Sequence, residues 1–203
     1  MKKIFTIGHS ISSPENFHTY LLKNKIDVVV DVRSVPYSRF ADWFNKDELK
    51  EFLKSKNIYY IFMGDALGAR WEDEKLLFED GKVDFEKVKE TKKFQDGINR
   101  VINGIKKGYN IALMCSEKEP FDCHRFVLIS SFLKENFKDL DILHIYEDKT
   151  VSHKELEKRL IKKYEKKLPL LELGTKENII KEAYKLRNKD IAYNALEKIG
   201  DEI

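Results

Sequence analysis

The sequence is poor in the residues that mark disulfide-rich, fibrous and disordered chains. Among 203 residues there are only 2 cysteines, 4 prolines and 9 glycines. Two cysteines are too few for a disulfide framework, and so little glycine and proline excludes a collagen-like or wholly disordered chain. Hydrophobic residues make up 42% and aromatic residues 12% of the chain, enough to build a sizeable core. The length corresponds to one domain with an appendage.

A long hydrophobic run and an excess of one charge are also missing. No stretch of about 18 apolar residues occurs, and the apolar run after Met1 is too short for a signal peptide. We therefore predict a cytoplasmic protein without a membrane partner. The net charge of +3 is by itself too small to indicate a nucleic-acid partner. Residues 151–203 hold 13 basic and 10 acidic residues, so they carry this whole net charge.

Apolar strand-like segments alternate with amphipathic ones through the first 150 residues. The run from Val28 to Val30 is typical of a strand that is covered on both faces. Strands are predicted near residues 3–7, 26–32, 58–63, 110–115 and 141–146. Helices are predicted from residues 14, 45, 85 and 123, the last two reaching about residues 106 and 136. This alternation predicts a three-layer α/β fold, in which helices flank a mainly parallel sheet of about five strands.

The pattern changes after residue 150. We predict an α/β core domain over residues 1–150 and a helical C-terminal extension, packed on the core, over residues 151–203. Ser152 and Glu155 form a capping box, and the helix that follows has a lysine-rich face. Such a face is typical of a solvated helix, but it also suits a phosphate backbone, so a non-catalytic nucleic-acid-binding module is one alternative function.

Polar residues gather where the predicted strands end. Ligands of open α/β sheets bind outside the carboxyl ends of the strands, so these positions predict a site. The residues are His9 and Ser10 after the first strand, Asp31, Arg33 and Ser34 after the second, Cys115 and Glu117 after the fourth, and Cys123, His124 and Arg125 at the next helix start. Gly8 precedes this set and would allow a ligand to approach the backbone closely.

These residue types suit proton transfer beside an anionic substrate. The predicted catalytic residues are Glu117, Asp31, Cys115 and His9. The predicted substrate-binding residues are Ser10, Arg33, Ser34, Arg39, His124 and Arg125. An ion pair of Asp31 with Arg33 or Arg125 is compatible with this role. The aromatic residues after Arg39 would either stack on a base or close the core; they are Phe40, Trp43 and Phe44.

The two cysteines leave several interpretations open. Cys115 would be a thiolate nucleophile, activated by a helix start and by Arg125, or a small buried hydrophobe. Cys115, Cys123 and His124, with His9 as a further candidate, would also suit zinc. Seven residues separate the cysteines, however, where zinc sites usually have two to four. No metal is therefore assigned, and the cofactor stays open. No Gly-x-Ser-x-Gly elbow occurs, which argues against a serine hydrolase.

Several short strings occur together between residues 4 and 150. They are Thr6 to Ser10, Asp31 to Phe40, Phe44-Asn45, Leu67-Gly68, Ala112 to Pro120, Cys123 to Arg125 and His144-Ile145. In this combination the chain resembles the prokaryotic family catalogued as domain of unknown function number 488. Ala69 departs from the family pattern, which usually has a second glycine there. The resemblance implies a compact α/β fold with a polar strand-end site, and no established activity.

A second similarity concerns mechanism. Val29 to Arg33 is similar to the Asp-x-Arg strand of rhodanese-type sulfurtransferases, and the loop after Cys115 is similar to their persulfide-carrying cysteine loop, although it is longer here. This similarity implies Cys115 as the nucleophile, supported by Asp31 and Arg33. The sequence thus predicts an enzyme that binds a phosphorylated or nucleic-acid-related substrate, with thiol or sulfur transfer by Cys115 as the alternative enzymatic function. It does not indicate the oligomeric state.

Overall fold

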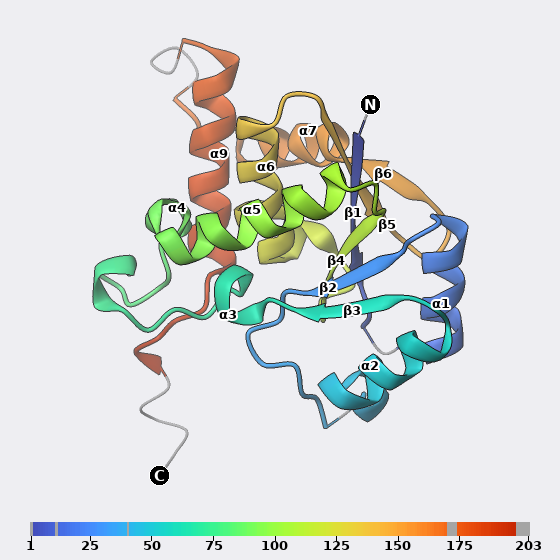
Figure 1. The fold of residues 1–203 in the computed structure, drawn as a ribbon. Coiled ribbons are helices and arrows are strands. Elements are labelled where there is room, and N and C mark those ends of the chain that lie inside the picture. Colours follow the sequence, from blue (N-terminus) through green and yellow to red (C-terminus); the bar gives the residue numbers. More distant parts are fainter. Residues whose placement is uncertain (1, 11, 40, 170–173, 198–203) are drawn as a thin grey trace.

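A six-stranded sheet forms the centre of the molecule (Figure 1). The computed structural model describes residues 2–10, 12–39, 41–169 and 174–197. The strand order is β3-β2-β4-β1-β5-β6; the first five strands pair in parallel, and β6 pairs antiparallel with β5. The strands are β1 (Lys2–Gly8), β2 (Val28–Asp31), β3 (Tyr59–Phe62), β4 (Ile111–Cys115), β5 (Leu140–Ile145) and β6 (Thr150–Ser152). The predicted mainly parallel sheet is confirmed.

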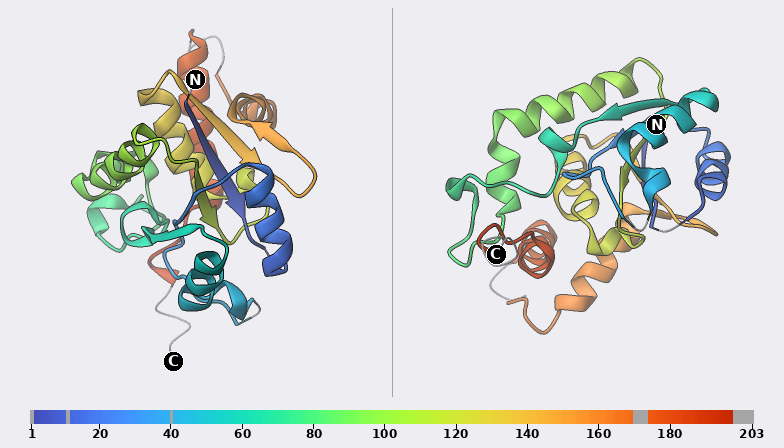
Figure 2. Two further views of the ribbon diagram at one scale, coloured as in Figure 1. Left: turned by 45° about the vertical axis from the view of Figure 1, so that its right-hand side comes forward. Right: turned by 90° about the horizontal axis from the view of Figure 1, so that it is seen from below.

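Helices cover both faces of the sheet (Figure 2). The two longer helices on one face are α1 (Pro14–Lys23) and α2 (Lys46–Ser55); those on the other are α5 (Lys92–Lys106), α6 (Ser131–Asn136) and α7 (His153–Tyr164), with α9 (Lys176–Ile191) packed on α7. Successive residues of a strand face opposite sides of the sheet. Accordingly Val29 packs in the apolar cluster with α1 and α2, whereas Val28 and Val30 pack in the opposite cluster. The predicted three-layer α/β fold is therefore confirmed.

Short helical segments complete the part of the chain that the structure describes. They are α3 (Gly64–Leu67), α4 (Phe85–Glu90), a π-helical turn (Arg125–Ser130) and the 3₁₀ turns Asp42–Phe44, Glu74–Leu76 and Pro120–Asp122. The long helix predicted from residue 85 is split, because the Thr91 side chain accepts a hydrogen bond from the Phe94 amide and caps a new helix. The helix predicted from Cys123 begins later, because Cys123 itself has extended backbone angles.

The predicted helix start at residue 45 is also modified. Asn45 precedes α2, but its side chain accepts a hydrogen bond from the Ser38 amide and makes no cap bond to the helix. The tertiary fold determines which group the Asn45 side chain binds, because the segment before α2 folds back onto Asn45. The sixth strand was missed for a similar reason. β6 has three residues and is followed at once by α7, so only its pairing with β5 identifies it.

The residues after residue 150 pack in the same apolar cluster as residues of the preceding segment. The capping box of Ser152 and Glu155 is present at the start of α7. The apolar stripe of α7 is buried in the same cluster as β4, and its lysine-rich face is exposed. The predicted boundary at residue 150 falls within β6, and the division into two parts stays a prediction. In the part of the chain that the structure describes, no helix is both long and apolar enough to span a membrane.

A buried chain of hydrogen bonds joins α7 and α9 to the sheet. Thr6 contacts His144 Nδ1 at 2.8 Å, His144 Nε2 contacts His153 Nδ1 at 3.2 Å, and His153 Nε2 contacts the Tyr184 hydroxyl at 2.9 Å. The Tyr184 hydroxyl can then donate to Glu157 at 3.4 Å. When both histidines are neutral, each group in this series can donate one hydrogen bond to the next, from Thr6 to Glu157. Burial holds the pKa of His144 well below its usual range and lowers that of His153 to about 3.

This network makes stability dependent on pH. Between pH 6.5 and about 3, His153 binds a proton only in the unfolded chain, so acidification favours unfolding. The stability advantage of the wild type over His153→Gln should shrink by up to about 1.4 kcal/mol per pH unit as the pH falls from 6.5 to 5. Urea unfolding at several pH values measures this difference, in which the other titrating groups largely cancel. A difference that stays constant with pH would contradict the assignment.

Candidate metal centre

The carboxyl ends of β1, β4 and β2 lie side by side, because β4 pairs with both neighbours. Gly8 lies opposite Cys115 in the β1–β4 register, and Asp31 lies opposite Met114 in the β2–β4 register. The pairing continues past the strand ends, since the His9 amide donates to the Cys115 carbonyl at 3.0 Å. The strand-end residues singled out in the sequence therefore lie on neighbouring strands at one edge of the sheet.

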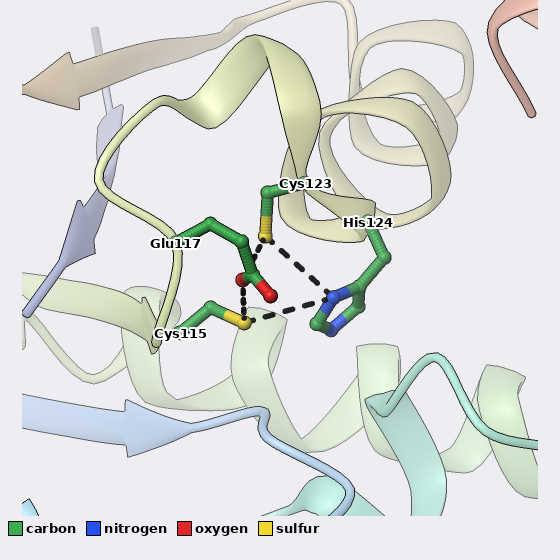
Figure 3. Close-up of side chains that lie close together, drawn as sticks. All are labelled: Cys115, Glu117, Cys123 and His124. Atoms are coloured by element: carbon green, nitrogen blue, oxygen red, sulfur yellow. Dashed lines mark hydrogen bonds between the residues drawn. The ribbon is translucent and has the colours of Figure 1, made fainter. Parts of the chain in front are cut away.

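Four side chains converge at this edge (Figure 3). The potential ligand atoms of Cys115, Glu117, Cys123 and His124 all lie within 4.8 Å of one another. Glu117 Oε2 accepts hydrogen bonds from Cys115 Sγ at 2.7 Å and from Cys123 Sγ at 3.1 Å. His124 Nδ1 lies 3.8 Å from Cys115 Sγ and 3.6 Å from Cys123 Sγ. Both cysteines are free thiols. The loop after β4 thus folds back so that its two ends meet.

The orientation of His124 is set from the opposite side of its ring. Nε2 lies 3.1 Å from the Val32 carbonyl oxygen, which follows β2. A carbonyl oxygen only accepts hydrogen bonds, so Nε2 carries the proton and Nδ1 presents its lone pair to the two sulfur atoms. Metal-binding histidines are commonly oriented in this way, by a backbone carbonyl on the far nitrogen.

Burial differs among the four groups and shifts their pKa values. Cys115, Cys123 and His124 are buried, whereas Glu117 is exposed as a residue but turns its carboxylate onto the two buried thiols. Burial, followed by the hydrogen bond with Cys123, raises the pKa of the Cys115 thiol. Burial opposes ionisation of Cys123 too, but the Cys115 hydrogen bond and the Arg125 charge lower the pKa of that thiol. Desolvation raises the pKa of Glu117. One thiolate and one protonated neighbour are therefore favoured.

Arg125 lies fully buried beneath this loop. Its guanidinium donates to the Glu117 carbonyl at 2.7 Å and to the Lys118 carbonyl at 3.1 Å. Its charge also favours ionisation of both cysteines and of Glu117. The close backbone approach predicted at Gly8 is made by this loop, because the Glu117 carbonyl occupies the place that a side chain at position 8 would need.

A second polar network lies beside the first and contains three predicted catalytic or binding residues. Asp31 and Arg33 form a buried ion pair with bonds of 2.6 and 2.9 Å, as one interpretation of the sequence expected. Arg33 also donates to the Phe44 carbonyl at 2.8 Å and lies 3.2 Å from His9 Nε2. The Tyr60 hydroxyl donates to Asp31 at 2.7 Å. The hydrogen-bonding groups of this network are thus engaged with one another.

His9 is held as a neutral ring within this network. Its Nδ1 donates to the Ser10 carbonyl at 2.6 Å, and its ring stacks on Phe44 with centroids 4.2 Å apart. Burial and the nearby Arg33 charge lower the pKa of His9 to about 4. His9 is not in the group of four potential ligands. Phe44 is buried, so it closes the core as one interpretation expected.

The remaining predicted residues are not members of the four-residue group. Ser34 Oγ accepts a hydrogen bond from the Arg70 amide at 3.0 Å, and Arg39 is exposed. Trp43 is 39% exposed and donates its indole proton to the Ser12 carbonyl. Phe40 lies outside the described residues. The roles predicted for Ser10, Ser34 and Arg39 in substrate binding stay predictions.

Sequence reasoning missed several residues that support the site. Tyr60 contacts Asp31 only because β3 pairs with β2, and the Val32 carbonyl contacts His124 across a separation of 92 residues. Neither contact has a local sequence signal. Glu117 was assigned to proton transfer but not to a ligand set; its position two residues after Cys115 is the signal that could have added it. A groove of about 430 Å³ lies away from this site, between β3 and α5.

Gly8→Ala tests the packing of the loop against β1. The new methyl group would overlap with the Glu117 carbonyl, which Arg125 holds in place. We expect a loss of about 1–3 kcal/mol in the free energy of unfolding, measured by urea denaturation. Gly104→Ala is the matched control, since its methyl group would meet only the flexible end of Ile111. Equal stability of the two variants would contradict this packing.

A comparison with known families extends this description. A family model described as domain of unknown function DUF488 matches residues 13–132. No curated protein and no solved structure matches the chain. The match lends no support to the similarity with rhodanese-type sulfurtransferases. It includes all four potential metal ligands, whereas β1, α7 and α9 lie outside it. Because the matched segment is more than half of the chain and contains the candidate site, the chain belongs to the DUF488 family of domains of unknown function.

Proposed function

We propose that this chain is a zinc-dependent enzyme, in which Cys115, Cys123 and His124 hold the ion and Glu117 lies beside the fourth position, which is left for water. The observation that carries the proposal is the convergence of two thiols, a carboxylate and an oriented imidazole nitrogen within 4.8 Å. Sulfur and imidazole donors favour zinc over magnesium or calcium, which prefer oxygen ligands. The seven residues between the cysteines argued against zinc in the sequence. They matter less in the structure, because the loop folds back and brings Cys123 close to Cys115.

Charge balance supports a bound cation. Two cysteines and one glutamate are acidic groups that converge on one point, and Glu117 Oε2 lies close to both sulfur atoms. A divalent ion together with the buried Arg125 cation would neutralise two thiolates and one carboxylate. Without that ion, burial penalises ionisation of the same groups, as the raised pKa values of Cys115 and Glu117 indicate.

The distribution of exposure favours a catalytic over a purely structural ion. Catalytic zinc sites use three protein ligands, Cys₂His among them, and keep one position for water or substrate. Here the three nitrogen and sulfur ligands are buried and the carboxylate residue is exposed. Zinc in such a site lowers the pKa of bound water and polarises the group under attack. Glu117, whose own pKa is raised, would accept the proton of the attacking water.

The reaction class is therefore hydrolysis. A phosphorylated or nucleic-acid-related substrate is the one that the sequence predicts, and one exposed cation of the loop, Lys118, supports it. Lys118 follows Glu117 directly in the sequence. Its side chain is 61% exposed and forms an ion pair with Glu147. Arg33 and Arg125 are engaged with protein acceptors, so they would position the loop and the strand ends beside the substrate.

Thiol chemistry is the second candidate, because two free sulfur atoms lie beside a buried cation. The Arg125 charge favours ionisation of either thiol, so one member of the pair would be the thiolate, and the sequence suggests Cys115. A bound zinc ion would engage both sulfur atoms. Metal content and thiol reactivity therefore separate the two candidates.

Zinc content tests the proposal directly. Untagged protein refolded with zinc should retain one ion per chain after dialysis, measured by elemental analysis. Cys115→Ser, Cys123→Ser and His124→Ala should each lose it, because each removes one of three buried ligands. His18→Ala, at a histidine on α1, is the matched control and should retain the ion. Chelation should increase the rate at which the two thiols are alkylated, because the ion no longer engages the sulfur atoms. Metal-free wild type with one rapidly alkylated cysteine would instead support thiol chemistry.

Glu117→Gln separates proton transfer from metal binding. The zinc-loaded wild type is first screened against phosphate esters, nucleotides and short oligonucleotides. On a substrate found there, the variant should lose about 10²–10⁴-fold in kcat while keeping zinc, because the amide cannot accept the proton of the attacking water. Glu90→Gln on α4 should be as active as the wild type. Undiminished turnover by the Glu117 variant would refute the assigned role.

A further inference from the structure

The turn between the two halves of the candidate metal centre is held by the C-terminal helices. Residues 118–122 separate Cys115 and Glu117 from Cys123 and His124, and residues 119–122 form the turn. Within this turn the Phe121 amide donates to Glu119 Oε1, and the Cys123 amide donates to the Pro120 carbonyl at 3.1 Å. The position of Cys123 therefore depends directly on the geometry of the turn.

Arg187 of α9 makes the most extensive contacts with this turn. Its Nε donates to the Phe121 carbonyl at 3.1 Å, its Nη2 pairs with Asp122, and its guanidinium lies 4.7 Å from the Phe121 ring. Arg187 is only 5% exposed. An arginine buried to this extent on one turn fixes both the backbone and a side chain of that turn, since its planar fork forms several directed hydrogen bonds.

Arg159 of α7 holds the same turn from a second helix. Its guanidinium lies 3.2 Å from Glu119 and 4.2 Å from the centre of the Phe121 ring. Tyr146, just after β5, donates to the other oxygen of Glu119 at 2.7 Å. Phe121 is itself 2% exposed, so its ring is enclosed by the two arginines and the core. Two helices and the end of a strand thus meet on four residues.

We propose that Arg187 is a positioning residue of the metal centre. It fixes the turn at residues 120–122, so that Cys123 and His124 face Cys115 and Glu117 before the ion binds. This inference rests on the proposed function for its consequence in metal affinity. It also assigns a role to α9, which lies outside the segment that the family model matches. The C-terminal helices then belong to the architecture of the site.

The test compares full-length wild type with Arg187→Ala and with Lys185→Ala, a control on the exposed side of α9. Zinc affinity is measured by competition with a chromophoric chelator. Arg187→Ala should bind zinc about 10–100-fold more weakly, as is typical when a residue that supports metal ligands is removed. Its cobalt complex should show altered sulfur-to-cobalt charge-transfer and d–d bands, which report the ligand geometry. Arg187→Lys should recover part of the affinity, because it restores the charge beside Asp122 but not the fork.

Amide hydrogen exchange of the metal-free proteins makes the positioning role testable without zinc. Arg187→Ala should increase exchange at residues 117–123 while the sheet keeps its protection. Wild-type zinc affinity, cobalt spectrum and exchange in Arg187→Ala would overturn the inference. If Arg187→Ala does not fold, Asp122→Asn, which removes the charged partner on the exposed side, takes its place. If the wild type binds no zinc, the proposed function is wrong, and the exchange comparison still decides whether Arg187 orders the turn.

Discussion

The candidate site depends on one buried cation, the guanidinium of Arg125. It lies beneath the loop after β4, where water cannot compensate its charge, and it donates to the backbone carbonyls of Glu117 and Lys118. These bonds anchor the loop against Gly8 of β1. The same positive charge favours ionisation of the two cysteines and of Glu117. One interaction therefore shapes the loop and prepares its acidic groups to receive a cation.

The order of the strands places the other groups that hold the loop after β4. β4 lies between β1 and β2, so the loop that leaves it passes the ends of both neighbours. The Val32 carbonyl after β2 orients His124, and the absence of a side chain at Gly8, the last residue of β1, admits the loop. Asp31, Arg33 and His9 form a separate, internally satisfied network at the same edge. The hydrogen-bonding groups of these three residues are engaged within that network, and the catalytic and binding roles that the sequence predicts for them stay predictions.

The C-terminal helices are joined to the sheet by two polar systems of different character. The chain from Thr6 through His144 and His153 to Tyr184 is neutral and buried, and it connects β1 and β5 to both helices. The contacts of Arg159 and Arg187 are ionic and reach the turn before Cys123. The first system couples stability to the protonation of histidine, and the second links the helices to the geometry of the candidate site.

By itself the sequence determined the α/β alternation, the parallel sheet and the edge at which polar residues meet, because apolar periodicity and helix capping are local signals. It also identified the loop bracketed by Cys115 and Cys123. Only the tertiary structure decided that Glu117 joins the cysteines, that His124 presents Nδ1, and that β6 exists. It likewise revealed that Arg187 contacts Asp122 across 65 residues. These features depend on strand order and on the packing of distant segments, which no local pattern of residues encodes.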